Sequence, residues 1–232
     1  METLRRPLEW GAAIFTREGE AESGDRYAVA PFDGGILVAA IDGLGHGKEA
    51  ALAAELASRI LEDDPHESVI TLVSRCHEGL RSTRGVVMSL ASFATRAETM
   101  TWLGVGNVEG RLVRARGDGP PSDRRQGERR LRDQAVAAER RRAERRGSST
   151  FEFLLLRAGV VGSHLPPLDG ALLPIRPGDT LLLTTDGVAL PDLVDIDPDE
   201  RPQETAERIL SRHKKGTDDG LVVVARWVGL PG

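Results

Sequence analysis

A chain of 232 residues, 40% hydrophobic and 29% charged, is long enough for one globular domain with a sizeable core, and we interpret residues 1–232 as a single domain. Its net charge of −5 argues against a general nucleic-acid binder, because such proteins need a broad basic surface to displace counterions. No stretch approaches the roughly 20 apolar residues of a membrane span, so no membrane partner is expected. The single cysteine, Cys76, excludes an intrachain disulfide and favours a cytoplasmic location.

Strands and then two helices are predicted for the first third of the chain. Short apolar runs bounded by Gly, Asp and Pro predict strands at Leu8–Phe15, Arg26–Pro31 and Gly35–Ile41. Apolar residues spaced three and four apart predict helices at Ala50–Leu61 and Ser68–Leu80. In the first helix, the apolar face is assigned to residues four apart, namely Leu52, Leu56 and Ile60.

The predicted strands that follow are not separated by helices. Val86–Ala94, Met100–Val105 and Gly110–Arg114 are joined by residues 96–99 and by Gly106-Asn107, which we interpret as hairpin connections. Consecutive strands without crossover helices imply antiparallel pairing, so the pattern predicts an α+β domain and not a doubly wound fold. The remaining predicted elements are strands at Phe151–Arg157, Leu181–Thr185 and Leu221–Val228, a turn at 159–167, and a helix at Pro202–His213.

Residues 117–150 differ in composition from the rest of the chain. Between 124 and 146 there are ten arginines and four acidic residues, a local charge of +6 that leaves the remainder at −11. We interpret this segment as an insertion between two strands, either a solvated helix with pairs such as Glu128–Arg132 or a disordered region. Alternatively, this basic segment has a function and forms a surface that docks an acidic partner.

Acidic residues lie at or beside the ends of several predicted strands, and most are followed by glycine. They occur in Asp42-Gly43, Asp186-Gly187 and Asp218-Asp219-Gly220, with Ser23-Gly24-Asp25 as a fourth group. A single Asp-Gly is usually a turn. Carboxylates that are distant in sequence and gathered at one sheet end can, however, hold two hard cations about 3.5–4 Å apart.

These motifs resemble the PPM (type 2C) metal-dependent protein serine/threonine phosphatases. The ordered set is Ser23-Gly24-Asp25, Asp42-Gly43-Leu44-Gly45-His46-Gly47, Gly104-Val105-Gly106-Asn107, Pro177-Gly178-Asp179, Thr184-Thr185-Asp186-Gly187 and Asp218-Asp219. The order and the chain length are similar to the bacterial SpoIIE, RsbU and RsbX branch, with RsbX-like members as the nearest in size. The resemblance covers nearly the whole chain except residues 117–150.

The resemblance implies a fold, a metal site and a reaction. The implied fold is an α-β-β-α sandwich of two antiparallel sheets flanked by helices. The implied cofactors are two divalent cations, Mn²⁺ or Mg²⁺, which activate a water that hydrolyses phosphoserine or phosphothreonine. Asp42 would bridge both ions, the Gly43 carbonyl would bind one, Asp186 and Asp218 would hold the other, and Asp25 would act through water. The family's last motif commonly has Thr two residues after its acidic pair, where this chain has Leu221, so either Asp218 or Asp219 is a candidate ligand.

Three other residues have two interpretations each. His46 either protonates a leaving group or meets a phosphate, or it is a loop histidine bonded to backbone. Arg84 either faces an incoming phosphate or is a solvated turn residue. Cys76 lies in an apolar helical pattern, which favours a core residue over a nucleophile.

Several functions are compatible with these observations. The leading hypothesis is a phosphatase acting on a phosphorylated anti-anti-sigma or stressosome-type protein in a bacterial stress-signalling pathway. The alternative is a catalytically weak module of the same fold that acts through protein–protein contacts. A nucleotide-binding loop at Gly43–Gly47 is disfavoured, because Lys48 is followed by Glu49 where a phosphate loop needs Ser or Thr.

Overall fold

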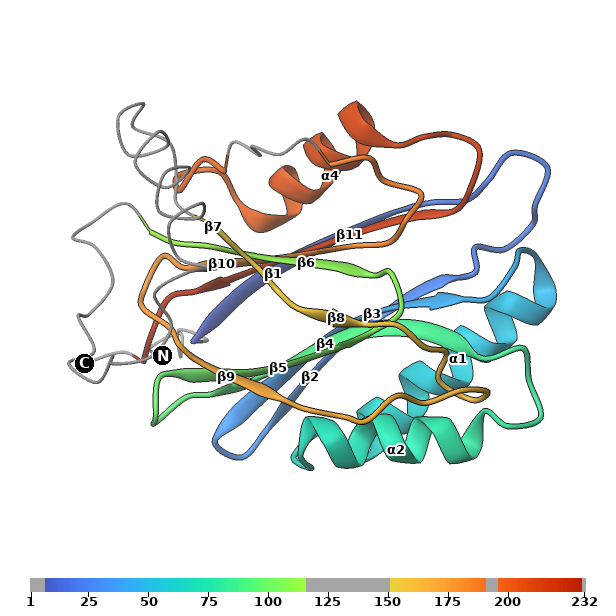
Figure 1. The fold of residues 1–232 in the computed structure, drawn as a ribbon. Helices are drawn as coiled ribbons and strands as arrows, with labels where there is room; N and C mark the ends of the chain where they lie inside the picture. The colour runs from blue at the N-terminus through green and yellow to red at the C-terminus, as the bar shows by residue number, and fades with distance from the viewer. Residues whose placement is uncertain (1–6, 116–150, 191–195, 231–232) are drawn as a thin grey trace, which may run out of the picture.

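The computed structural model describes residues 7–115, 151–190 and 196–230, and the predicted insertion at 117–150 lies outside these ranges. Two β-sheets are stacked face to face, and helices cover both outer faces (Figure 1). The elements in chain order are β1 (Leu8–Phe15), β2 (Asp25–Phe32), β3 (Gly35–Gly43), α1 (Lys48–Asp63), α2 (Val69–Gly79), β4 (Val86–Ala94), β5 (Thr99–Val105), β6 (Glu109–Val113), β7 (Phe151–Phe153), β8 (Leu156–Arg157), β9 (Ala171–Pro174), β10 (Thr180–Thr184), α4 (Pro202–His213) and β11 (Gly220–Trp227).

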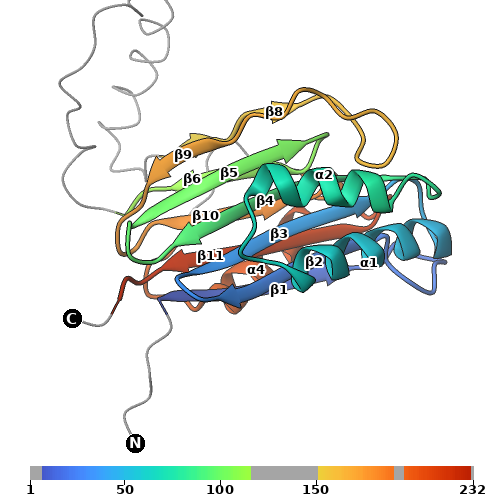
Figure 2. The ribbon, with the colours of Figure 1, turned by 90° about the horizontal axis from the view of Figure 1, so that it is seen from below.

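The two sheets have different helices on their outer faces. One sheet has the strand order β1-β11-β10-β6-β7 and carries α4. The other has the order β2-β3-β4-β5-β8, with β9 also paired to β5, and carries α1 and α2 (Figure 2). All strand pairs are antiparallel except β5 with β8, so the predicted α-β-β-α sandwich is confirmed. None of the helices in the described parts of the chain is long and apolar enough to cross a bilayer.

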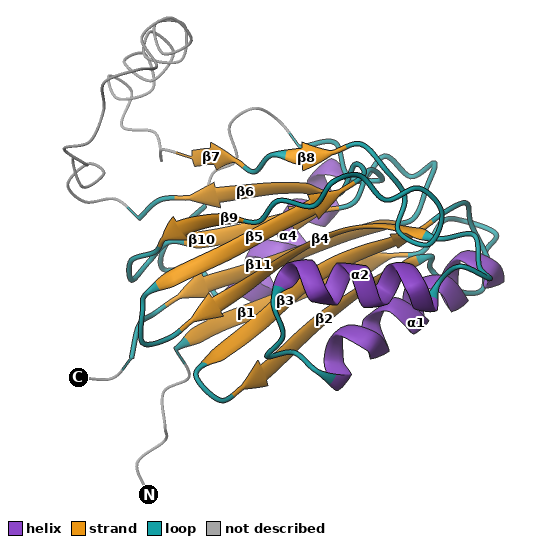
Figure 3. Ribbon diagram, turned by 60° about the horizontal axis from the view of Figure 1, so that its bottom comes forward, coloured by secondary structure: helices purple, strands orange, loops and turns teal. Residues whose placement is uncertain are grey.

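One predicted hairpin and one predicted strand are wrong. Gly106-Asn107 does not close a hairpin, because β5 lies in one sheet and β6 pairs with β10 and β7 in the other (Figure 3). The predicted strand Phe151–Arg157 is two short strands, of which β7 joins the sheet of β6 and β8 joins that of β5. In both cases the chain passes between sheets, a long-range choice that local turn chemistry does not encode. The short strand β9 was not predicted.

The predicted apolar face of α1 is wrong for two of its three residues, whereas the third, Ile60, is partly buried and packs against the core. Leu52 is 57% exposed and Leu56 is 37% exposed. The buried face is instead made almost entirely of alanine, with one leucine at its end: Ala50, Ala51, Ala53, Ala54, Ala57 and Leu61, together with Ser58. Alanine lets the helix axis approach the sheet closely, whereas leucine on this face would hold it away. The spacing of large side chains therefore indicated the wrong face.

The helix α2 follows its prediction. Its buried residues are Val69, Leu72, Val73 and Cys76, and the Ser68 hydroxyl caps its first turn by accepting a hydrogen bond from the Thr71 N–H. Cys76 is fully buried, and burial raises the pKa of its thiol to about 12. A thiol in this setting stays protonated at neutral pH, which confirms its interpretation as a core residue.

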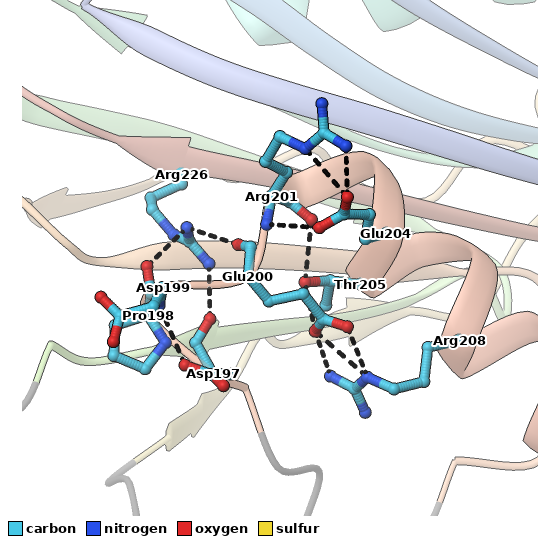
Figure 4. A network of polar contacts seen from close by, with 9 residues as sticks. All are labelled: Asp197, Pro198, Asp199, Glu200, Arg201, Glu204, Thr205, Arg208 and Arg226. Atoms are coloured by element: carbon cyan, nitrogen blue, oxygen red, sulfur yellow. Dashed lines mark hydrogen bonds and ion pairs between the residues drawn. The ribbon is translucent and has the colours of Figure 1, made fainter.

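A polar network fixes the N-terminal end of α4 against β11 (Figure 4). The buried guanidinium of Arg226 donates to the carbonyls of Asp197, Pro198 and Glu200 at distances of 2.8–3.0 Å. The Glu200 carboxylate in turn accepts from Arg208, at 2.7 Å from Nη2, and from the Thr205 hydroxyl at 2.9 Å. These contacts lock the helix to the sheet that supplies two of the acidic motifs.

The assignment of the α1 face predicts opposite results for two substitutions. Ala57→Leu places three extra carbons in the packed layer between α1 and the sheet, and we expect it to destabilise the protein by about 1–3 kcal/mol. Leu52→Ala, on the exposed face, is expected to change stability by less than about 0.5 kcal/mol. Both residues favour helix, so urea unfolding of the two variants reports packing. Destabilisation by Leu52→Ala with a neutral Ala57→Leu would contradict the assignment.

Candidate metal centre

Five aspartates from four separate segments lie at one end of the sandwich. Asp25 begins β2 and is the direct cross-strand partner of Asp42 near the end of β3. Asp186 follows the end of β10. Asp218 and Asp219 precede the start of β11, and β11 pairs with β10 in antiparallel fashion. We call these five residues the carboxylate centre. Each sheet therefore contributes acidic residues from two adjacent strands.

A threonine joins the two halves of this centre. The Thr185 hydroxyl donates a hydrogen bond of 2.7 Å to Asp25 Oδ2 and accepts one of 2.9 Å from the Leu221 N–H. Thr185 and Asp25 are both 1% exposed. Because Asp25 lies in one sheet and Thr185 at the edge of the other, this bond fixes the relative position of the sheets at the centre.

Asp218 and Asp219 have different environments. Asp219 is 5% exposed, and its two carboxylate oxygens accept hydrogen bonds from the backbone N–H groups of Arg17 and Gly24, each at 2.7 Å. Its side chain thus secures the loop between β1 and β2. Asp218 is partly exposed and accepts from the Asp219 N–H at 2.9 Å. The carboxylate of Asp218 is consequently the more accessible of the two and has fewer backbone hydrogen bonds.

The glycines after Asp42 and Asp186 permit close backbone contact. A Cβ on Gly43 would lie 2.2 Å from the Ala50 carbonyl oxygen at the start of α1. A Cβ on Gly187 would lie 1.7 Å from the Asp219 carbonyl oxygen. Neither glycine has a positive φ, so backbone freedom is not what requires glycine here. Their function in the fold is to bring the acidic segments together.

Burial and mutual repulsion disfavour ionisation of the two central carboxyl groups. Desolvation by burial, followed by the charges of Asp25, Asp186, Asp218 and Asp219, raises the pKa of Asp42 to about 8. Burial likewise raises the pKa of Asp25 to about 7, although the hydrogen bond from Thr185 acts in the opposite direction. These charge interactions show that Asp42 and Asp25 lie within electrostatic range of the other three aspartates.

This donor set fits divalent cations. It consists of carboxylate oxygens, which are ligands for Mg²⁺ and Mn²⁺, and none of the causes that shift the pKa of Asp25 or Asp42 is a cationic side chain. Across residues 7–115, 151–190 and 196–230, no group of three or more His, Cys, Asp or Glu side chains is already arranged to hold an ion. Binding would therefore require the carboxylates to turn towards the ion.

His46 lies in an exposed ion pair beside this centre. Its Nδ1 is 2.6 Å from Glu20 Oε1, and the two side chains are 55% and 26% exposed. Its described partner is thus a carboxylate from the β1–β2 loop, whereas one of the sequence interpretations expected a backbone group. The structure brings Asp25, Asp42, Asp186, Asp218 and Asp219 together and leaves His46 at the rim.

Two residues with no role in the sequence interpretation position members of the centre. Asn107 Nδ2 donates to Asp186 Oδ2 at 2.9 Å, and Thr185 holds Asp25 as described. Asn107 lies on the segment that crosses between the sheets, which explains how it reaches Asp186. Thr185 is next to Asp186 in one of the sequence motifs, and Asn107 ends a different motif, so membership of a motif was the signal available for both.

No protein-family model matches the chain. Among curated proteins it is similar to the phosphoserine phosphatase RsbX of Bacillus subtilis (strain 168), with 27% identity over 92 residues. The match spans 40% of this chain and 46% of RsbX, so less than half of the relative is covered.

Solved structures extend the similarity to almost the whole fold. One, described as "The bacterial stressosome: a modular system that has been adapted to control secondary messenger signaling", superposes with a TM-score of 0.76 and 27% identity over 95% of this chain and 100% of the other. RsbX in complex with magnesium has a TM-score of 0.72 and 18% identity over 97% and 99% of the two chains.

More distant structures share the fold alone. The PP2C phosphatase domain of SpoIIE from Bacillus subtilis has a TM-score of 0.66 and 18% identity, covering 97% of this chain and 64% of the other. The PstP catalytic domain in complex with two manganese ions has a TM-score of 0.57 and 20% identity, covering 95% and 98%. The chain has the fold of the PPM-type phosphatases. Within that class, its predicted resemblance to the SpoIIE, RsbU and RsbX branch is confirmed.

The raised pKa values predict how the metal-free protein responds to pH. In the unfolded chain, Asp42 has a pKa near 3.8, and in the folded protein about 8, so the folded state binds more protons between these values. Stability in the presence of EDTA should therefore fall as pH rises from about 4 to about 8. Asp42→Asn should raise the melting temperature at pH 8 by about 3 °C or more, and should have little effect at about pH 4.

The control for this measurement is Asp33→Asn, at an exposed aspartate in the turn between β2 and β3. It removes the same charge and should leave the melting temperature unchanged at both pH values. Equal effects of the two substitutions at pH 8 would show that net charge, and not the carboxylate centre, sets the pH dependence.

Proposed function

We propose that this chain is a protein serine/threonine phosphatase that depends on two divalent cations, Mn²⁺ or Mg²⁺. The observation that carries the proposal is the carboxylate centre, where five aspartates converge and two of them have raised pKa values with no cationic side chain among the causes. The structures of RsbX with magnesium and of PstP with two manganese ions support the choice of ions. The products are a protein hydroxyl and inorganic phosphate.

Each residue of the centre has a proposed task. Asp42 would hold both ions, with the Gly43 carbonyl on one, and Asp186 and Asp218 would hold the other. Asp25 would contact the site through water, kept in place by the Thr185 hydroxyl. When bound, the cations would lower the pKa of water and neutralise charge on the phosphoryl oxygens. Asn107 would orient Asp186, and Asp219 would serve the loop that it secures.

His46 keeps two proposed roles at this site. Its position at the rim, paired with Glu20, supports either a proton donor to the departing serine or threonine oxygen or a contact to the phosphate. The Glu20 carboxylate would fix the orientation of the imidazole ring in both cases.

The proposed substrate is a phosphorylated anti-anti-sigma or stressosome-type protein in the cytoplasm of a bacterium. Similarity to RsbX and to a structure from the bacterial stressosome supports this partner class. A buried, unpaired Cys76 is compatible with a reducing compartment. A binding module of the same fold without strong activity is the second candidate, but it gives no reason to retain four separate acidic segments that repel one another.

Removal of Asp42 tests the proposed activity. With Mn²⁺, the wild-type chain should release phosphate from p-nitrophenyl phosphate and from a phosphoserine protein, and Asp42→Ala should lower kcat/KM about 100-fold or more. Asp33→Ala, at the exposed turn, serves as the charge-matched control and should retain full activity. If the wild-type chain is inactive with both Mn²⁺ and Mg²⁺, or if Asp42→Ala is as active as wild type, the phosphatase proposal is wrong.

Adjacent substitutions at Asp218 and Asp219 should separate ion binding from stability. Asp218→Asn should raise the Mn²⁺ concentration needed for half-maximal activity at least about 10-fold and leave urea stability nearly unchanged. Asp219→Asn places an amide donor against a backbone N–H donor, and should cost about 1–3 kcal/mol of stability. The reverse pattern would exchange the roles of the two residues.

A further inference from the structure

Arg84 lies in the connection between α2 and β4, at the same end of the sandwich as the carboxylate centre. Gly43 is the register partner of Val86, the first residue of β4. The Leu44 N–H donates to the Gly85 carbonyl at 3.1 Å, so the loop after Asp42 is joined directly to the residue after Arg84. The backbone thus holds Arg84 beside the segment that begins at Asp42.

The guanidinium of Arg84 lies over the backbone of Gly45. A Cβ built on Gly45 would be 2.8 Å from Arg84 Nη1, and Gly45 has a φ of +90°. Most other residues would be strained in this conformation, and the flexible Arg84 side chain would have to shift to make room for a Cβ. Gly45 therefore lets the Arg84 guanidinium approach the backbone of the loop between Asp42 and α1.

The described ionic partner of Arg84 is Glu49, in the first turn of α1. Arg84 Nε is 2.5 Å from Glu49 Oε2, and the two side chains are 54% and 67% exposed. An ion pair this exposed contributes little net free energy, typically about 0–1 kcal/mol. A phosphoryl dianion carries more negative charge than the Glu49 carboxylate and can also bind the planar guanidinium through two oxygens. It would therefore displace Glu49 from Arg84 at a small cost in free energy.

We infer that Arg84 binds the phosphoryl group of the substrate and that Glu49 competes with the substrate for the same guanidinium. The inference rests on the proposed phosphatase function and assigns that site its anion-binding side chain. Asp25, Asp42, Asp186, Asp218 and Asp219 alone would repel a phosphate dianion. A guanidinium held beside the loop between Asp42 and α1 would offset part of that repulsion and orient the phosphoryl oxygens.

Substitution of Arg84 tests the contact to phosphate. Arg84→Ala should lower kcat/KM about 10- to 100-fold for both p-nitrophenyl phosphate and a phosphoserine protein, because both present the same phosphoryl group. Arg84→Lys keeps the charge without the bidentate geometry and should fall between alanine and wild type. The matched control is Arg81→Ala, at an exposed arginine in the same connection, which should change kcat/KM less than about twofold.

Substitution of Glu49 should act in the opposite direction. Glu49→Gln removes the competing carboxylate and should lower KM about 2- to 5-fold, since exposed pairs of this kind are weak. In the Arg84→Ala background, Glu49→Gln should have no further effect on KM. A purely structural ion pair would give losses for both single variants, so a rise in KM for Glu49→Gln would overturn the competition.

Binding of inorganic phosphate tests the same inference without turnover. At constant ionic strength and with Mg²⁺ present, phosphate should raise the melting temperature of wild type and of Arg81→Ala, and should have at most a small effect on Arg84→Ala. Inactivity of the wild-type chain would overturn the proposed function, while this phosphate measurement would still test Arg84. Equal stabilisation of all three proteins, or loss of activity on the protein substrate alone, would overturn the assignment of Arg84 to the phosphoryl group.

Discussion

Asp25 and Asp42 are neighbours across the β2–β3 pair, and their carboxyl groups are held close together away from bulk water. Each disfavours ionisation of the other, and the acidic residues of the opposite sheet add to the repulsion. Folding must oppose this repulsion, and the two apolar strand layers and the Thr185 hydroxyl do so. The fold therefore gathers acidic groups whose ionisation is unfavourable without a ligand, and a divalent cation would supply the positive charge that lets them ionise.

Small residues make that concentration possible. The alanine face of α1 lets the helix lie close against β3, and the Ala50 carbonyl occupies the space that a side chain on Gly43 would fill. Gly187 similarly lets the segment after β10 pass within contact distance of the Asp219 backbone. A larger side chain at any of these positions would push an acidic segment outward, so the site depends on packing as much as on its carboxylates.

The sequence predicted which acidic residues come together better than it predicted the path of the chain. Acidic residues at strand ends followed by glycine are a local pattern, and the strands that carry Asp42 and Asp186 were visible from their apolar runs. The passage of the chain between sheets at Gly106-Asn107 and within 151–157 depends on which distant strand each segment pairs with, and this was missed. The buried face of α1 was missed because the largest side chains are the exposed ones. The different environments of Asp218 and Asp219 depend on hydrogen bonds to residues some 200 positions away, which no local motif records.

The carboxylate centre belongs to neither sheet alone. Asp25 and Asp42 come from one sheet, Asp186, Asp218 and Asp219 from the other, and the described hydrogen bonds between the two groups are those of Thr185 with Asp25 and of Asp219 with the β1–β2 loop. A slide of one sheet over the other would therefore separate the acidic residues before it disturbed any strand pairing. Since Asn107 sits on the crossing between the sheets and orients Asp186, the same displacement would also alter that carboxylate. The alignment of the sheets would thus be a condition for the proposed ion binding, and the buried side chains that pack between the sheets would contribute to it.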